Sequence, residues 1–149
     1  MRLIIAGVAA LAFAGAAAGA ATAPSDANRA AIFKAADFKA KGDKYTHCED
    51  DVTPSYTPGS IELEDLNGDG MQEAWVKESS TFCYGNTAEY FVLVGKDAKG
   101  EWRRLLESPG IATTLKTKSK GFPDIEVGGP GAGPFPVYRY NGKAYTKKK

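Results

Sequence analysis

From residue 61 onward, the sequence alternates short apolar or β-branched runs with turns rich in Gly, Asn and Asp. Such runs favour β-strands, and the turns between them are too short to hold a crossover helix. We expect strands at residues 61–64, 73–77, 89–94, 101–106, 111–116, 124–127, 137–140 and 143–145. The last two flank Asn141-Gly142, a dipeptide that strongly favours a two-residue hairpin turn. The sequence therefore predicts an antiparallel meander sheet.

One helix is expected before this sheet, over residues 26–41. Ser25 is a residue type that caps helix N-termini, and Gly42 is one that commonly ends a helix. The apolar stripe of the helix consists of Ile32, Phe33 and Ala36, with Phe38 beside it. Because one apolar stripe must be covered, we expect the helix to pack on a face of the sheet. The predicted fold class is α+β, mostly β.

The first 20 residues have the pattern of a secretory signal peptide. Arg2 precedes an uncharged apolar run, and Ala18-Gly19-Ala20 fits the small-x-small cleavage rule. A membrane-spanning anchor is the alternative, but the second half of the run is only weakly hydrophobic and no charged stop follows. We therefore expect a single domain at residues 21–146, no membrane span after cleavage, and a periplasmic or secreted location.

Charge is nearly balanced, with 19 Lys and Arg against 18 Asp and Glu. A nucleic-acid binder needs a basic patch, so this balance argues against nucleic acid as a partner. The lysines at residues 147–149 are a local exception. We interpret them as a solvated basic tail, with an anionic partner site as the alternative.

The two cysteines, Cys48 and Cys83, are an even number in a chain predicted to be exported. Oxidising compartments favour disulfides, so we expect these two residues to be bonded rather than free. The bond would pin the polar segment at residues 42–60, which we expect to be a loop, and would stabilise the fold by about 3–4 kcal/mol.

Residues 65–73 place side-chain oxygens at loop positions 1, 3, 5 and 9, with glycines between them. Oxygen ligands at this density suit Ca²⁺, which takes six to eight of them. The predicted ligands are the side chains of Asp65, Asn67, Asp69 and Glu73 and the backbone carbonyl of Met71. A hairpin turn without metal is the alternative, but it would crowd three acidic side chains into one loop.

An EF-hand would need a bidentate Glu at loop position 12, where this chain has Val76. Residues 61–76 instead resemble the calcium hairpin of FG-GAP/VCBS repeats and integrin-α-like propellers. The resemblance implies Ca²⁺ in a loop between two antiparallel strands. It does not extend to the propeller, because the chain has one such loop. Residues 81–85 and 121–129 are similar to segments of small exported bacterial proteins of unassigned function.

Other chemistry has weaker support. A catalytic dyad would need His47 beside a free Cys83 thiol, and the expected disulfide leaves no free thiol. One His and two Cys are too few ligands to complete a structural zinc site. The glycine-rich run at residues 128–134 lacks the Lys and Ser/Thr of a phosphate-binding loop. Several carboxylates on predicted strands are expected on solvated faces: Glu62, Glu64, Glu78, Glu89 and Glu126.

These observations predict an exported binding or structural module of the cell envelope, stabilised by calcium and without catalytic residues. Aromatic side chains on the open sheet face would suit a protein or glycan partner. An inhibitor or immunity-type partner of an envelope enzyme is one alternative. A small hydrolase using carboxylate or metal-assisted chemistry is another.

Overall fold

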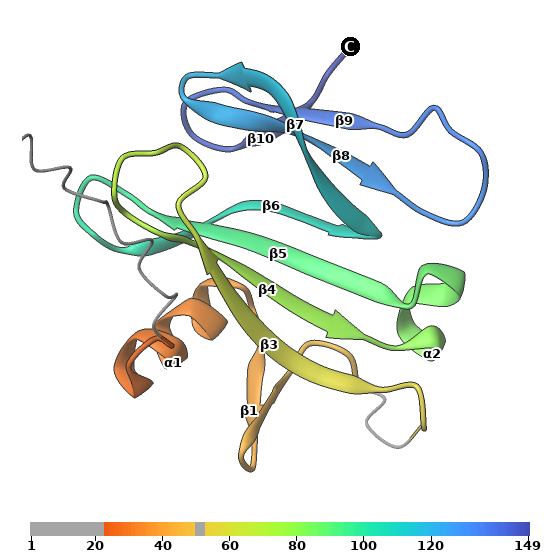
Figure 1. Ribbon diagram of the computed structural model, residues 1–149. Coiled ribbons are helices and arrows are strands. Elements are labelled where there is room, and N and C mark those ends of the chain that lie inside the picture. Colours follow the sequence, from red (N-terminus) through yellow and green to blue (C-terminus); the bar gives the residue numbers. More distant parts are fainter. Residues whose placement is uncertain (1–22, 50–52) are drawn as a thin grey trace, which may run out of the picture.

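The computed structural model describes residues 23–49 and 53–149 (Figure 1). The predicted signal peptide at residues 1–20 lies outside them. The described helices are α1 (Asp26–Ala35), α2 (Thr81–Tyr84) and the 3₁₀ turn η1 (Gly85–Thr87). The strands are β1 (Lys39–Lys41), β2 (Lys44–Thr46), β3 (Thr57–Glu64), β4 (Glu73–Ser79), β5 (Glu89–Lys96), β6 (Trp102–Pro109), β7 (Ile111–Ser119), β8 (Phe122–Gly128), β9 (Val137–Tyr140) and β10 (Tyr145–Lys147). Within this part of the chain, no helix is long and apolar enough to cross a bilayer.

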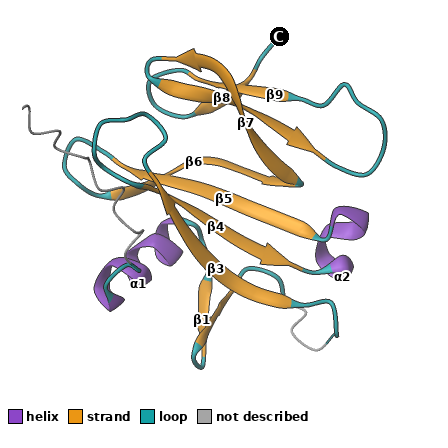
Figure 2. Cartoon of the chain, viewed as in Figure 1, coloured by secondary structure: helices purple, strands orange, loops and turns teal. Residues whose placement is uncertain are grey.

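The elements form three layers. A four-stranded sheet, β3-β4-β5-β6, lies between a second four-stranded sheet, β10-β9-β8-β7, and a layer made of α1 and the β1–β2 hairpin (Figure 1). All strand pairs are antiparallel, and within each sheet the strands follow chain order. Strands dominate the chain (Figure 2), so the α+β, mostly β prediction is confirmed.

Two cores separate these layers. The inter-sheet core comprises Leu66, Trp75, Phe91, Leu93, Leu105, Leu106, Phe122, Ile125, Val127, Tyr140 and Tyr145. The helix-side core comprises Ile32, Phe33, Ala36, Phe38, Ala74, Val76, Tyr90, Val92 and Val94. Residues of β5 enter these cores alternately, because successive side chains of a strand point to opposite faces. This explains its unbroken apolar run: the middle sheet is covered on both sides.

Helix α1 ends earlier than residue 41, so that boundary was wrong. Ser25 caps its start, accepting the N–H of Asn28 at 3.4 Å. At the other end Asp37 has a φ of 64°, and the N–H of Phe38 donates to the carbonyl of Phe33 at 2.9 Å. This is a Schellman motif, usually made with glycine at the left-handed position. Residues 39–41 therefore form strand β1 instead.

The sequence predicts one meander sheet, but the structure has two stacked sheets. The chain passes from the first sheet to the second at Gly110. Gly110 has a φ of 123°, and a Cβ there would lie 2.6 Å from the carbonyl oxygen of Gly128. Only glycine fits this crowded, left-handed position between β6 and β7. The chain then starts the second sheet, which continues to Lys147, paired with Tyr138.

The predicted disulfide between Cys48 and Cys83 is present, with the two Cα atoms 6.2 Å apart. It fastens the segment after β2 to α2, at the end of the middle sheet. The segment at residues 42–60 is less irregular than expected. It contains β2 and the first residues of β3, which begins at Thr57.

Candidate metal centre

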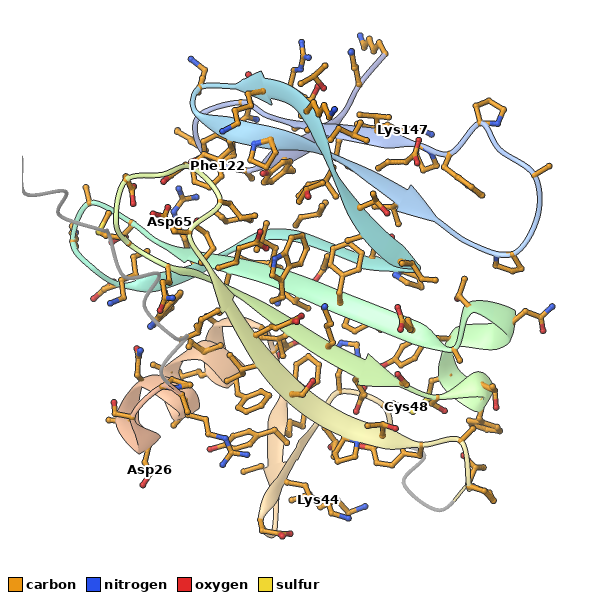
Figure 3. The ribbon with its side chains drawn as sticks, in the orientation of Figure 1. Asp26, Lys44, Cys48, Asp65, Phe122 and Lys147 are labelled. Carbon is orange, nitrogen blue, oxygen red and sulfur yellow. A yellow bond between two sulfur atoms is a disulfide. The ribbon has the colours of Figure 1, made fainter. Side chains whose placement is uncertain are left out.

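The loop between β3 and β4, which carries the predicted calcium ligands, lies where the two sheets meet. Leu66 anchors it, because this side chain is only 7% exposed and packs in the inter-sheet core with Phe122. A Cβ on Gly121 would lie 3.8 Å from the Cβ of Asn67, so the loop also approaches the β7–β8 turn. Figure 3 shows this loop, with Asp65, reaching toward the sheet that carries Phe122.

Asp65 organises the first half of the loop. Its Oδ1 accepts the N–H groups of Gly68 at 2.8 Å and Asp69 at 3.2 Å, and its Oδ2 accepts that of Gly70 at 2.9 Å. The two glycines have φ values of 77° and 86°, which let the backbone wrap around this one carboxylate. The carboxylate at position 1 therefore sets the shape of the loop.

Asn67 and Asp69 face each other across the turn. The Asn67 amide donates to Oδ2 of Asp69 at 2.9 Å, and its Oδ1 accepts the Asp69 N–H at 2.9 Å. Oδ1 of Asp69 accepts the N–H of Met71 at 2.7 Å. These local side-chain to backbone bonds are typical of Asx turns. They bring the side chains at positions 3 and 5 into direct contact.

Glu73 lies beneath the loop at the start of β4. It is only 5% exposed, and its Oε2 accepts the N–H of Leu66 at 3.0 Å. Burial, followed by the carboxylates of Asp69 and Asp65, raises the pKa of Glu73 to about 7. A carboxyl group in this position would be more easily ionised with a cation beside it.

The structure thus gathers the four predicted side-chain ligands in one loop. It does not arrange them as a finished metal site. Among residues 23–49 and 53–149, no group of three or more His, Cys, Asp or Glu side chains has the geometry to hold a metal ion. Met71 contributes its N–H to the hydrogen bonds of the loop, by donating to Asp69. Coordination of a metal by the Met71 carbonyl stays a prediction. The donor set contains only oxygen, which suits a hard cation such as Ca²⁺.

A second polar centre lies beside the disulfide, around Glu78 of β4. Its side chain is 1% exposed and accepts four hydrogen bonds from neutral groups. Oε1 accepts from the His47 N–H at 3.1 Å and the Tyr56 hydroxyl at 3.0 Å. Oε2 accepts from the Cys48 N–H at 2.9 Å and the Tyr84 hydroxyl at 2.5 Å. This carboxylate joins the segment after β2 and the short helix α2 to the middle sheet.

The expectation that Glu78 is solvated was therefore wrong. It has the same parity along β4 as Ala74 and Val76, which are buried in the helix-side core. Strand alternation alone would have placed its side chain inside. The residue type pointed the other way, toward solvent, because Glu is rarely buried unless its carboxylate oxygens accept hydrogen bonds.

His47, the one histidine of the chain, borders this centre. Its ring stacks on Tyr90 with centroids 4.5 Å apart, and its Nδ1 lies 3.4 Å from the Tyr84 hydroxyl. Cys83 is held in the disulfide, so it cannot act as a thiolate beside this histidine. The contacts of His47 are those of a packing residue at the end of the sheet.

Two further carboxylates line a pocket of about 410 Å³ between the open edges of the sheets. Glu62 forms an ion pair with Lys77, and Oε2 of Glu64 accepts the indole N–H of Trp75 at 2.9 Å. Both carboxylates thus have partners on the neighbouring strand. They help to hold β3 against β4.

No family model matches the chain, and it matches neither a curated protein nor a solved structure. The resemblance of residues 61–76 to calcium hairpins therefore stays an expectation that rests on the loop's own residues.

Proposed function

We propose that the protein is an exported binding module of the cell envelope, stabilised by one Ca²⁺ ion in the β3–β4 loop. The observation that carries this proposal is that one loop gathers four side chains with oxygen donors, Asp65, Asn67, Asp69 and Glu73, with the carboxylate of Glu73 buried beneath it. A divalent cation would offset the negative charge that these carboxylates bring together.

The site's place in the fold gives the ion a structural role. The loop packs into the inter-sheet core through Leu66 and passes near the β7–β8 turn at Asn67, so Ca²⁺ would help to fix the two sheets relative to each other. An ion that binds only the folded protein stabilises it by about 2.7 kcal/mol at a hundredfold excess over Kd. Extracellular calcium modules work with Kd values of about 10⁻⁴–10⁻³ M, which suits an exported protein.

Export is supported by the Cys48–Cys83 disulfide, because such bonds persist in oxidising compartments. The signal-peptide pattern at residues 1–20 points the same way. We place the protein in the periplasm or in the secreted fraction.

An inhibitor-type partner of an envelope enzyme is the second candidate. Phe82 favours it, because this side chain is 76% exposed on α2, directly beside the disulfide. A large exposed aromatic on a covalently fixed segment is suited to insertion into a pocket of another protein.

The calcium proposal is tested by thermal unfolding in CaCl₂ and in EDTA. We expect Ca²⁺ at a hundredfold excess over Kd to raise the melting temperature by about 5–10 °C. The variant Asp69→Asn keeps an oxygen for the Met71 N–H but removes the charge, so it should lose most of this response.

Asp97→Asn is the matched control. Asp97 accepts the N–H groups of Lys99 and Glu101 in the β5–β6 turn, a role like that of Asp69 but outside the predicted site. This variant should keep the full calcium response. Equal melting temperatures of the wild-type protein in CaCl₂ and EDTA would contradict the proposal.

A further inference from the structure

Exposed apolar side chains gather at one end of the molecule. Among the described residues the large exposed hydrophobic side chains are Met71, Phe82 and Ile111, and the last two lie at this end. The N–H of Gly110, just before Ile111, donates to the carbonyl of Glu89, which follows η1 at the start of β5. In Figure 1, α2, the start of β7 and the β8–β9 loop lie at the same end. Apolar side chains gathered in this way mark an interaction surface.

Phe82 is a rigid apolar knob on this surface. Its side chain is 76% exposed, although the short helix α2 that carries it is fixed by a cap and by the disulfide. The hydroxyl of Ser80 accepts the Cys83 N–H at 3.2 Å, and the Cys83 sulfur is bonded to that of Cys48. A side chain presented on a fixed segment loses little conformational freedom when it enters a pocket, which favours binding.

The charge around this knob is negative. The disulfide joins two segments, residues 45–49 and 78–89, and neither contains a Lys or an Arg. Their exposed carboxylates are Glu49 and Glu89. Phe82 therefore has the surroundings that fit an apolar pocket lined by cations.

A pocket of this opposite character lies on the second sheet. Its volume is about 380 Å³, and it is lined by Pro134, Phe135, Pro136, Val137, Lys147, Lys148 and Lys149. The four loop residues are apolar, and the three lysines are exposed. These lysines outnumber the acids beside them, which are Glu126, in register with Val137, and the main-chain carboxylate of Lys149. The pocket is large enough for a phenyl ring, and its charge favours one that is flanked by carboxylates.

The pocket is held in place next to the knob. Lys147 belongs to β10, and the N–H of Lys148 donates to the carbonyl of Val137 at 2.7 Å. A Cβ on Gly129 would lie 3.2 Å from Cγ2 of Thr87, so the β8–β9 loop touches η1, which directly follows α2. The exposure of the Phe82 ring shows that it does not fill the pocket of its own chain.

We propose that two copies of the protein form a symmetric dimer in which Phe82 of each copy enters the lysine-lined pocket of the other. Knob and pocket lie at the same end of one chain (Figure 1), so a two-fold axis can satisfy both contacts at once. Glu49 and Glu89 of each copy would face the lysines of the other. This inference goes beyond the proposed binding module, because it assigns a surface through which the protein recognises itself.

Analytical ultracentrifugation between about 1 μM and 1 mM should show a reversible monomer–dimer equilibrium that weakens as salt rises. Phe82→Ser removes both knobs of a symmetric dimer and should raise the dimer dissociation constant about thirtyfold, because a central aromatic contact is lost twice. Its melting temperature at low concentration should equal that of the wild-type protein, since the side chain is exposed. A protein that stays monomeric at millimolar concentration would overturn the proposal.

Charge reversal tests which two surfaces pair. The variants Glu49→Lys/Glu89→Lys and Lys147→Glu/Lys148→Glu/Lys149→Glu should each lose dimer formation, because like charges then meet at both contacts. Mixed in equal amounts, the two variants should form a heterodimer. The new lysines of the first then meet the new glutamates of the second, and the two unaltered surfaces still match. A mixture that stays monomeric would show that these surfaces do not pair.

Lys116→Glu/Lys118→Glu/Lys120→Glu is the matched control. It makes the same change of charge with exposed lysines of β7 and the turn after it, which lie outside the pocket lining. This variant should dimerise like the wild-type protein. Equal losses for the two triple variants would mean that net charge alone governs association, and would overturn the proposed contact.

Discussion

At the residue scale, two buried carboxylates show different ways of tolerating charge. Glu78 is satisfied by four neutral donors from three segments. Asp124, which is fully buried, instead pairs with the Arg139 guanidinium, at 2.7 and 3.0 Å, and accepts the Thr117 hydroxyl at 2.8 Å. Buried charge that is bonded at each oxygen supports a fold, and becomes costly once a partner is lost.

The Asp124 pair predicts a pH dependence. The hydrogen bonds from Arg139 have the largest effect on the pKa of Asp124, and the bond from Thr117 has a smaller effect in the same direction. Together they hold this pKa below its usual value despite burial. A lowered folded-state pKa stabilises the fold above the unfolded pKa, and this stabilisation is lost as pH falls through the folded value. Asp124→Asn should therefore lower the free energy of unfolding at pH 5–7 and lose this difference below about pH 4.

Urea unfolding of both proteins between pH 2 and 7 measures this difference. Asp97→Asn is the comparison variant, because it also removes a carboxylate with a lowered pKa, but one bonded to backbone N–H groups in an exposed turn and not to a guanidinium. A pH-independent gap between wild type and Asp124→Asn would show that the aspartate acts through packing alone.

At the element scale, the strands from β3 onward were predictable because each is a short run bounded by turn residues, whereas β1 and β2 were not expected. The β9–β10 hairpin follows from Asn141 and Gly142, although its return strand starts at Tyr145 rather than 143. The end of α1 was not predictable in this way, because Asp37 takes a conformation that sequence rules assign to glycine. The sequence could bring Asp65, Asn67, Asp69 and Glu73 together because their spacing is a local property of the chain, and calcium binding by them stays a prediction.

Glu78 joins three elements, so its replacement should loosen all of them together. Glu78→Gln keeps the shape but puts an amide donor against groups that already donate. We expect a loss of about 2–4 kcal/mol in the free energy of unfolding. Denaturant unfolding measures it, with Glu89→Gln on the exposed start of β5 as the control, expected within about 0.5 kcal/mol of wild type. Equal stability of the two variants would refute the structural role of this carboxylate.

At the scale of the whole molecule, the stacking of two sheets was beyond the reach of local patterns. A meander of consecutive strands is equally compatible with one sheet or two. The need for glycine at position 110 arises from its close approach to the Gly128 carbonyl, a contact between residues that the local sequence does not reveal. The pocket between α1 and the β5–β6 hairpin was not predictable for the same reason. Its lining comes from α1 and a hairpin that lie far apart in the sequence.

Leu66 is the side chain through which the β3–β4 loop enters the inter-sheet core. Leu66→Ala should lower the free energy of unfolding by about 2–4 kcal/mol, as for other buried leucines. It should also weaken calcium binding, because the loop loses its anchor. Met71→Ala, in the same loop but at a side chain 53% exposed, should change neither quantity appreciably. Paired denaturant and calcium titrations test both, and an unaltered calcium affinity in Leu66→Ala would uncouple the loop from the core.

The division of the meander at Gly110 has a consequence for how the protein matures. Every strand of the middle sheet, and both halves of the disulfide, precede the second sheet along the chain. A chain delivered N-terminus first across a membrane would present Cys48 and Cys83 to the oxidising side before β7 has emerged. Because consecutive strands pair with short loop closures, the first sheet and its covalent link can be completed during translocation, and the second sheet then folds down on a finished template.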